Sequence, residues 1–379
     1  LRREDAVLSR FPHINVRVFT VLVIVSLPLY ALAAIMVLGT GQAQFREAYG
    51  LQLTETAQQV AATIDSYVFR RVIDVSILTK VPDVRAAAAA GNKVPLDIGK
   101  ARALDAAWIA RPVATAAASG ILGNPASHFL SGVVANDRIY REIIVTDREG
   151  RLVAASGVCS DYIQSDEAWW KEAFHDGVQG RVSVSDVTFD ESAQSHAIEI
   201  AMPVSDPQGE QLAGVLKVVA DVRELLAVAA GVRSGRLGEA FIIREDGSVV
   251  FSQRGVGGKT RFFAADLLRE RMKSFASGDP QSSVHFSARN QDGRSYLVGV
   301  APSQLGASYP HLDWMVAVTQ AEEDLFAPAR VQMWRMLALF GLIAGLVLAI
   351  AAWFSVRLAA SPVGKDTHLS EHPAVPRIE

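Results

Sequence analysis

Cysteine and histidine are scarce in this sequence, and neither sign of charge is in large excess. Cys159 is the only cysteine among 379 residues, so an intramolecular disulfide cannot form; an intermolecular bridge or a quiet buried thiol remains open. The eight histidines have no cysteine close by in the sequence and are scattered apart from His368 and His372, which form an HxxxH pair near the C-terminal end; this gives little support for a zinc site. A net charge of −3 gives no reason to expect nucleic acid as a partner.

Motifs of catalytic sites are also missing. None of the serines lies in a GxSxG pattern. The stretch 257–260 (GGKT) resembles the end of a phosphate-binding loop, but Gln253 stands where that motif requires its first glycine. We therefore predict no catalytic residues, no metal site, no cofactor and no enzymatic activity.

Long hydrophobic runs are present instead, one toward each end of the chain. Residues 16–38 carry no charge beyond Arg17, and residues 336–356 are uncharged between Arg335 and Arg357. A helix of about 20 apolar residues crosses a bilayer, so we predict two transmembrane helices. A cleaved signal peptide is the alternative for the first run, which is longer than the apolar part of a typical signal peptide.

The charges that flank these runs predict the orientation of the chain. Basic residues precede the first run and follow the second: Arg2, Arg3, Arg10, Arg17, Arg357, Lys365 and Arg377. Basic flanks favour the cytoplasmic side. The tails, residues 1–15 and 357–379, are thus expected in the cytoplasm. Residues 41–330 are expected in the periplasm, in a two-pass protein of the bacterial inner membrane.

A long helix is predicted directly after the first run. Between residues 41 and 80, apolar residues recur at broadly helical spacing and no proline interrupts them. Pro82 is expected to end the helix. A further helix is predicted to open at Asn124 and Pro125, because proline suits the first helical turn.

The region after the helix contains the same pattern twice. Residues 143–156 and 241–253 each show an apolar run, an acidic turn with glycine and a second apolar run, which is typical of a β-hairpin. Each hairpin is followed by a helix and three strand-like runs. We therefore predict two α+β modules, residues 81–226 and 227–330, each with a five-stranded antiparallel sheet.

The resulting order of elements resembles the double Cache extracytoplasmic sensor domain of bacterial receptors. In that family a membrane-distal and a membrane-proximal PAS-like module follow a long helix. The resemblance covers residues 41–330, and these segments carry it: 145–150 (VTDREG), 160–170 (SDYIQSDEAWW), 184–187 (VSDV), 190–192 (DES), 201–204 (AMPV), 214–216 (GVL) and 312–314 (LDW). It implies that the distal module binds a small solute, that the proximal module relays, and that an output domain responds across the membrane.

The candidate site is the stretch 160–170, which combines aromatic and acidic residues. Residues 166–176 predict a helix in which Trp169 and Trp170 cannot face the same core, because neighbouring residues differ by about 100°. Trp170 is expected to pack with Phe174, and Trp169 to lie at the margin near Tyr162. Trp169 then either covers the sheet or, as the resemblance implies, contacts a ligand.

The acids bear on the chemistry of that ligand. Asp166 and Glu167 suit a first helical turn through the helix dipole, which alone accounts for them. In the amino-acid-binding branch of the family, the resemblance implies a carboxylate-binding arginine at the position of Glu167 and an amine-binding aspartate at that of Asp221. An acid in place of that arginine favours an amine or other cationic solute, held by rings and carboxylates. Neutral and anionic solutes stay open, as does a structural role for Asp221.

The predicted ligand-binding residues are therefore Tyr162, Asp166, Trp169, Trp170 and Asp221. About 22 residues follow Arg357, too few for an output domain, so the output lies on another polypeptide, such as a kinase or a receptor, or the chain is a truncated relative. The expected partners are a small-molecule ligand, membrane lipid and a second copy that dimerises through the long helix. The alternative function is a membrane-anchored scaffold or regulatory subunit with a vestigial pocket.

Overall fold

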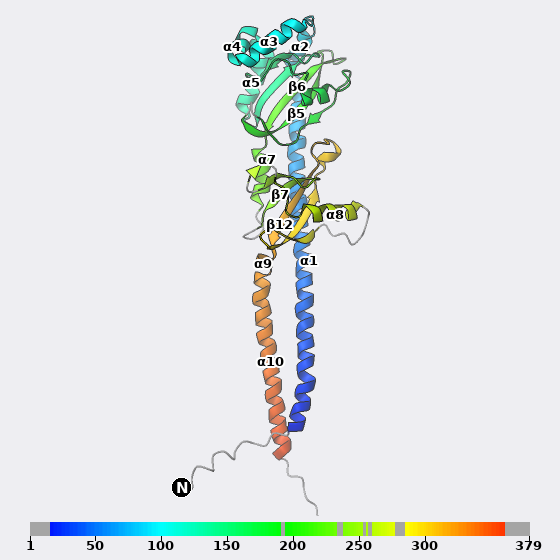
Figure 1. The fold of residues 1–379 in the computed structure, drawn as a ribbon, viewed down its shortest axis with the longest axis vertical. Coiled ribbons are helices and arrows are strands. Elements are labelled where there is room, and N and C mark those ends of the chain that lie inside the picture. Colours follow the sequence, from blue (N-terminus) through cyan, green and yellow to red (C-terminus); the bar gives the residue numbers. More distant parts are fainter. Residues whose placement is uncertain are drawn as a thin grey trace, which may run out of the picture. The chain divides into compact units, whose positions relative to one another are not determined.

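The computed structural model of the protein describes residues 16–190, 194–232, 238–252, 255–256, 260–276 and 285–360. Residues 1–15 and 361–379, which hold the predicted cytoplasmic tails, lie outside the described residues. One compact unit is Arg46–Leu325, and a second combines the described parts of Leu1–Phe45 and Phe326–Glu379. Figure 1 labels the main elements.

Helix α1 (Val16–Leu78) is one continuous helix of 63 residues. The sequence predicted its second half from residue 41 and placed its end near Pro82. The helix in fact ends at Leu78, and Pro82 opens α2 (Pro82–Gly91) at a first-turn position, where its missing N–H costs no hydrogen bond. Along the second half of α1, Ile64, Val68 and Val75 are completely buried.

Three further helices and a 3-10 turn follow α2 in the distal module, and local signals account for the helix starts. They are α3 (Ile98–Ala110), α4 (Pro112–Ser119), the 3-10 turn η1 (Ile121–Gly123) and α5 (Pro125–Asn136). The predicted start at Asn124 is confirmed, because the Asn124 side chain accepts a hydrogen bond from the Ser127 N–H at 2.9 Å. A capping bond of this kind satisfies one of the free N–H groups of a helix start.

The distal sheet is antiparallel and has six strands in the order β2-β1-β6-β5-β3, with β4 paired to β5. Its strands are β1 (Tyr140–Thr146), β2 (Leu152–Ala155), β3 (Ser183–Val184), β4 (Thr188–Asp190), β5 (Ser195–Ser205) and β6 (Leu212–Asp221). Every residue of the central strand β6 is buried. Helix α6 (Ala168–Phe174) packs on one face of this sheet, and Trp108 of α3 belongs to the same hydrophobic cluster.

The proximal module repeats this plan. Its sheet has the order β10-β11-β12-β7-β8-β9. Its elements are α7 (Arg223–Gly231), β7 (Ala240–Arg244), β8 (Val249–Ser252), β9 (Gly255–Val256), α8 (Ala265–Ala276), β10 (His285–Arg289), β11 (Ser295–Pro302), η2 (Leu305–Ala307), β12 (Trp314–Ala321) and α9 (Glu322–Leu325). The duplicated α+β fold is thus confirmed, but the prediction of five strands was wrong by one strand in each sheet.

The extra distal strand has a physical cause. The sequence predicted one strand over residues 182–187, whereas the chain leaves the sheet after Val184 and rejoins it at Thr188. Between them Asp186 turns toward the proximal module, where it pairs with Arg244 and accepts a hydrogen bond from Trp314 Nε1 at 3.0 Å. A contact between the two modules therefore interrupts the strand.

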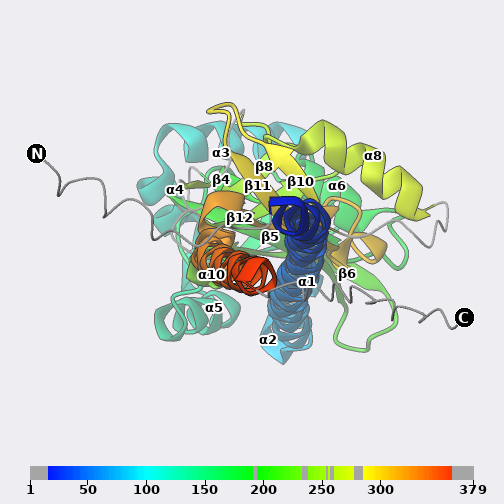
Figure 2. The same cartoon turned by 90° about the horizontal axis from the view of Figure 1, so that it is seen from below.

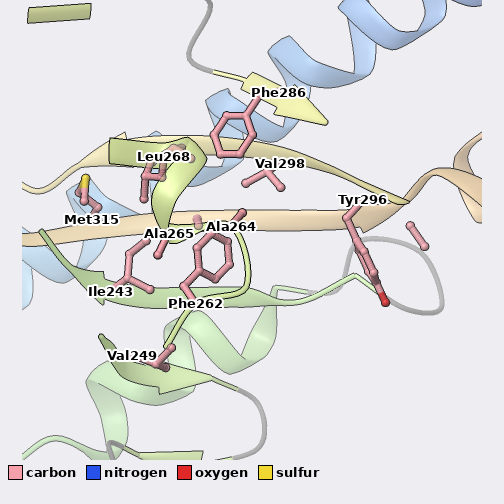
Figure 3. Close-up of a cluster of buried hydrophobic side chains, with 13 residues drawn as sticks. Ile243, Val249, Phe262, Ala264, Ala265, Leu268, Phe286, Tyr296, Val298 and Met315 are labelled. Carbon is pink, nitrogen blue, oxygen red and sulfur yellow. The ribbon is translucent and has the colours of Figure 1, made fainter. Parts of the chain in front are cut away.

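The proximal core lies between the sheet and α8 (Figure 3). Phe262 and Phe286 are buried there, beside Leu268 of α8. In Figure 2, α8 lies to one side of the proximal strands. The opposite face of β11 contacts α1, since a Cβ on Gly299 would lie 2.4 Å from the backbone of Leu53. Only glycine allows so close an approach of helix and strand.

Helix α10 (Ala327–Ala360) contains an apolar segment, Val331–Trp353, of 23 residues. Among the described helices this one is long and apolar enough to cross a membrane. The first predicted span falls in α1, where the apolar stretch is shorter, Val23–Ala33. The two-pass topology therefore stays a prediction.

A buried carboxylate joins α1 to the proximal module. Asp65 is 6% exposed and accepts hydrogen bonds from Ser303 Oγ at 2.5 Å and from the Gln304 N–H at 2.8 Å. We expect Asp65→Ala to destabilise the protein by about 1–3 kcal/mol, because it removes a buried acceptor that two part-buried donors share. Urea unfolding of the full chain in detergent measures this. Glu55→Ala, at an exposed position of the same helix, should stay within about 0.5 kcal/mol of wild type; equal losses would contradict the assignment.

Candidate functional site

Helix α6 brings both tryptophans of the aromatic stretch into the distal core. It is shorter than predicted, beginning at Ala168 and ending at Phe174. Trp170 stacks on Phe174 with ring centroids 4.4 Å apart and donates from Nε1 to Thr146 Oγ1 at 2.9 Å. The packing predicted for Trp170 is confirmed. Trp169 is not marginal, however: it is 6% exposed, against 7% for Trp170.

Trp169 faces a cation that the sequence interpretation missed. The Nζ atom of Lys217, from the centre of β6, lies 5.0 Å from the centroid of the Trp169 ring. It also lies 3.2 Å from Glu199 Oε1 on β5 and 3.6 Å from Glu142 Oε1 on β1. Lys217 is 7% exposed and Glu142 is 8% exposed. We call these four residues, Trp169, Lys217, Glu142 and Glu199, the lysine cluster.

The sheet register assembles the lysine cluster. Glu142 of β1 and Glu199 of β5 are both paired with Val219 of β6. Side chains two residues apart on a strand share a face, so Lys217 rises from the same face as these glutamates. One signal in the sequence pointed to it: Lys217 is a single charge inside the apolar run 212–220, and a buried charge requires partners.

The electrostatics of the cluster favour positive charge. Burial lowers the pKa of Lys217, but Glu199 and Glu142 outweigh burial and raise its pKa above the usual value. Burial also raises the pKa of the Cys159 thiol to about 12, assisted by Glu142. The neutral thiol matches the quiet buried cysteine considered from the sequence.

Asp166 lies at the exposed edge of this region. Carboxylate oxygens of Asp161, Asp166 and Glu167 all lie within 4.8 Å of one another. Burial and the two neighbouring aspartates raise the pKa of Glu167. An arrangement of this kind attracts cations, although exposed acids commonly cluster without binding one.

Tyr162 lines a different space. Its backbone N–H donates to Asp105 Oδ1 at 2.9 Å, and its ring lies 6.2 Å from that of Trp108. The side chain borders a cavity of about 610 Å³ between α2, η1 and β2, whose walls include Ala87, Ala90 and Ile121. Trp169 and Lys217 are not among the lining residues of this cavity.

Asp221 has an environment of its own at the end of β6. Its carboxylate accepts hydrogen bonds from Arg141 Nη2 at 2.6 Å and from Arg223 Nε at 2.9 Å. It borders a second cavity of about 400 Å³ together with Asp137 and Glu224. Burial raises the pKa of Asp221, but hydrogen bonds from the Arg223 N–H and Arg141 reverse the shift and leave it lowered. These contacts support the structural role that the sequence left open, since an amine would have to displace two guanidinium groups.

The fold and site define a class of protein: two PAS-like modules in tandem after a long helix, the first carrying a buried polar cluster under an aromatic helix. The family model for the Cache domain, in its dCache_1 form, matches residues 41–329. The chain therefore belongs to the Cache family, and it contains a Cache sensor domain of the extracytoplasmic kind found in membrane receptors.

Solved structures of bacterial chemoreceptor domains resemble the chain. The ligand-binding domain of Campylobacter jejuni Tlp3 in complex with L-norvaline has a TM-score of 0.50 at 10% identity, over 75% of this chain and 95% of that one. The domain of Pseudomonas fluorescens CtaA with L-serine gives 0.46 at 15%, over 73% and 99%. That of Pseudomonas aeruginosa PctB with L-Arg gives 0.43 at 16%, over 74% and 98%. No curated protein matches the sequence significantly.

Proposed function

We propose that the protein is a two-pass membrane sensor whose distal Cache module binds a small amine or other cationic solute in the periplasm. The membership of residues 41–329 in the Cache family supports the sensing role. The apolar segment Val331–Trp353 supports a membrane anchor. The chain acts as a homodimer that signals across the membrane, with a kinase or a receptor as a signalling partner.

One observation carries the choice of ligand. The lysine cluster holds a primary ammonium group between a tryptophan ring and two carboxylates, which is the arrangement proteins use for cationic ligands. The two glutamates exceed the single lysine in charge, and Asp161, Asp166 and Glu167 add negative charge nearby. Glu167 also stands where the amino-acid-binding relatives are expected to carry an arginine, so a simple α-carboxylate lacks its usual partner.

The helix over the cluster offers a path for the signal. Glu172 of α6 accepts a hydrogen bond from Ser183 Oγ at 2.8 Å and lies 3.0 Å from His311 Nε2 of the proximal module. Asp186 makes the second contact with the proximal module, through Arg244 and Trp314. A ligand that moves α6 would act on both contacts. Such a ligand shifts the equilibrium only by its differential affinity for the two states.

The test is a thermal-shift panel on the full chain in detergent, with monoamines, diamines, quaternary ammonium ions, amino acids and carboxylates. We expect a cationic solute to raise Tm with a saturable dose response. Trp169→Leu keeps an apolar side chain but removes the ring, and should lose most of that shift. Phe189→Ala, at an exposed aromatic position of the same module, should retain it. A shift by carboxylates alone would contradict the assigned ligand class.

A scaffold or regulatory subunit is the second candidate. The observation that favours it is the internal salt bridge of Lys217, which satisfies the cluster without a ligand. A folded chain with no response to any solute class would support the scaffold and reject the sensor.

A further inference from the structure

The ammonium group of Lys217 makes the contacts expected of a bound cationic ligand. Its ammonium has a ring on one side and carboxylates of two different strands on the others. The residue is in the middle of β6, where its backbone is paired with Ile144 on one side and Ala201 on the other. The four-carbon side chain therefore starts from the sheet and ends next to the ring of Trp169 in α6. It connects β6 to α6.

The lysine cluster holds more acidic than basic groups. One ammonium faces two carboxylates, and Asp190 adds to the negative potential at Lys217. Without Lys217, the Glu142 and Glu199 carboxylates would lose the ammonium that they share. Two like charges in a site of low exposure repel each other strongly. The folded module thus favours a cation at this position, whatever molecule supplies it.

We propose that Lys217 is a tethered internal occupant of the cation position in the distal site, and that free primary ammonium ligands bind there only by displacing it. This inference rests on the proposed function, and it adds that a ligand must compete with the Lys217 side chain for the cation position. A tethered group acts at an effective concentration on the order of millimolar or higher. Simple monoamines therefore lose to Lys217, and a true ligand must offer further contacts.

The lysine can be replaced by a free molecule of the same shape. Alanine at position 217 retains Cβ, so the missing part of the side chain is n-propylammonium. We expect Lys217→Ala to lower Tm of the full chain in detergent and n-propylammonium to restore it saturably. Methylammonium should need a concentration roughly tenfold higher, because it lacks two buried methylenes. Tetramethylammonium, which has no N–H donor, and propionate should fail at equal ionic strength.

Wild type provides the matched control, since its site is already filled. It should show no shift at amine concentrations that restore Lys217→Ala. Three results would overturn the proposal: a variant as stable as wild type, a variant that n-propylammonium stabilises no more than sodium chloride does, or an equal shift in wild type. Failure of every solute on wild type would reject the proposed function but not this inference, because rescue is measured on the variant.

A second set of variants covers the case in which Lys217→Ala does not fold. Adding Glu199→Gln removes one of the two charges, and this double variant should fold and still respond to n-propylammonium. Adding Glu142→Gln as well removes the preference for a cation, so the triple variant should fold and ignore the amine. A triple variant that responds as the double one does would overturn the proposal.

Discussion

Gly214→Ala is expected to unfold the distal module. A Cβ at this position would lie 1.8 Å from the carbonyl oxygen of Thr146 and 2.8 Å from its carbonyl carbon. Both atoms are backbone of β1, which pairs directly with β6 through Val145 and Leu216, so no side-chain rotation relieves the clash. Separation of the two central strands would be required. We expect a loss of about 4 kcal/mol or more, at the upper end for single substitutions, measured by urea unfolding of the full chain in detergent.

Gly132→Ala is the matched control for this prediction. Gly132 lies inside α5, and a Cβ there meets no described atom within 4 Å. Alanine in a helix interior is favoured over glycine by about 0.5–1 kcal/mol, so this variant should be slightly more stable than wild type. If the two alanine variants unfold at the same urea concentration, the close approach of β6 to β1 does not exist as described.

Arg151→Ala is expected to have the second-largest effect. The Asp147 carboxylate is completely buried and accepts from Arg151 Nε at 2.7 Å. The Nη2 group of Arg151 also donates to the carbonyls of Gly91 and Val94, at 3.0 and 3.1 Å, at the end of α2. Removal of the guanidinium leaves a buried carboxylate without its cation and two carbonyls without that donor. Losses of about 3–5 kcal/mol are typical when one partner of a buried pair is removed.

The pH dependence separates this cause from loss of packing. Burial already raises the pKa of Asp147 despite its hydrogen bonds from Arg151, and loss of the arginine should raise it further. A carboxyl whose folded pKa exceeds its unfolded value contributes stability at low pH, and this contribution is lost as pH rises through the folded value. The deficit of Arg151→Ala should therefore be smaller near about pH 4 than near pH 7.

The double variant Asp147→Asn, Arg151→Ala is the companion measurement. It removes the buried charge together with its partner, so it should be more stable at neutral pH than Arg151→Ala alone. Its stability relative to wild type should also vary less with pH. If Arg151→Ala loses the same stability at about pH 4 and at about pH 7, lost packing is responsible, and the unpaired carboxylate of Asp147 is not.

In the candidate site, the sequence predicted local packing but not the contacts between distant strands. The pattern of aromatic residues and acids directed attention to α6, and the packing of Trp170 on Phe174 followed from helical spacing. The position of Asp221 suggested an amine ligand, but Arg141 and Arg223 hold its carboxylate. Arg141 is distant in the sequence and adjacent only because β1 pairs with β6. Spacing along the chain could not reveal that contact.

The sequence by itself determined the order of the elements, the duplicated modules and the apolar segment of α10, because periodicity, turn residues and hydrophobic length are local properties of the chain. Only the tertiary structure decided which charges meet. Lys217 and Glu142 lie far apart in the sequence, and the register of β1, β6 and β5 brings both Glu142 and Glu199 to Lys217 beneath Trp169. A shift of one residue in that register would turn these side chains to the opposite face of the sheet.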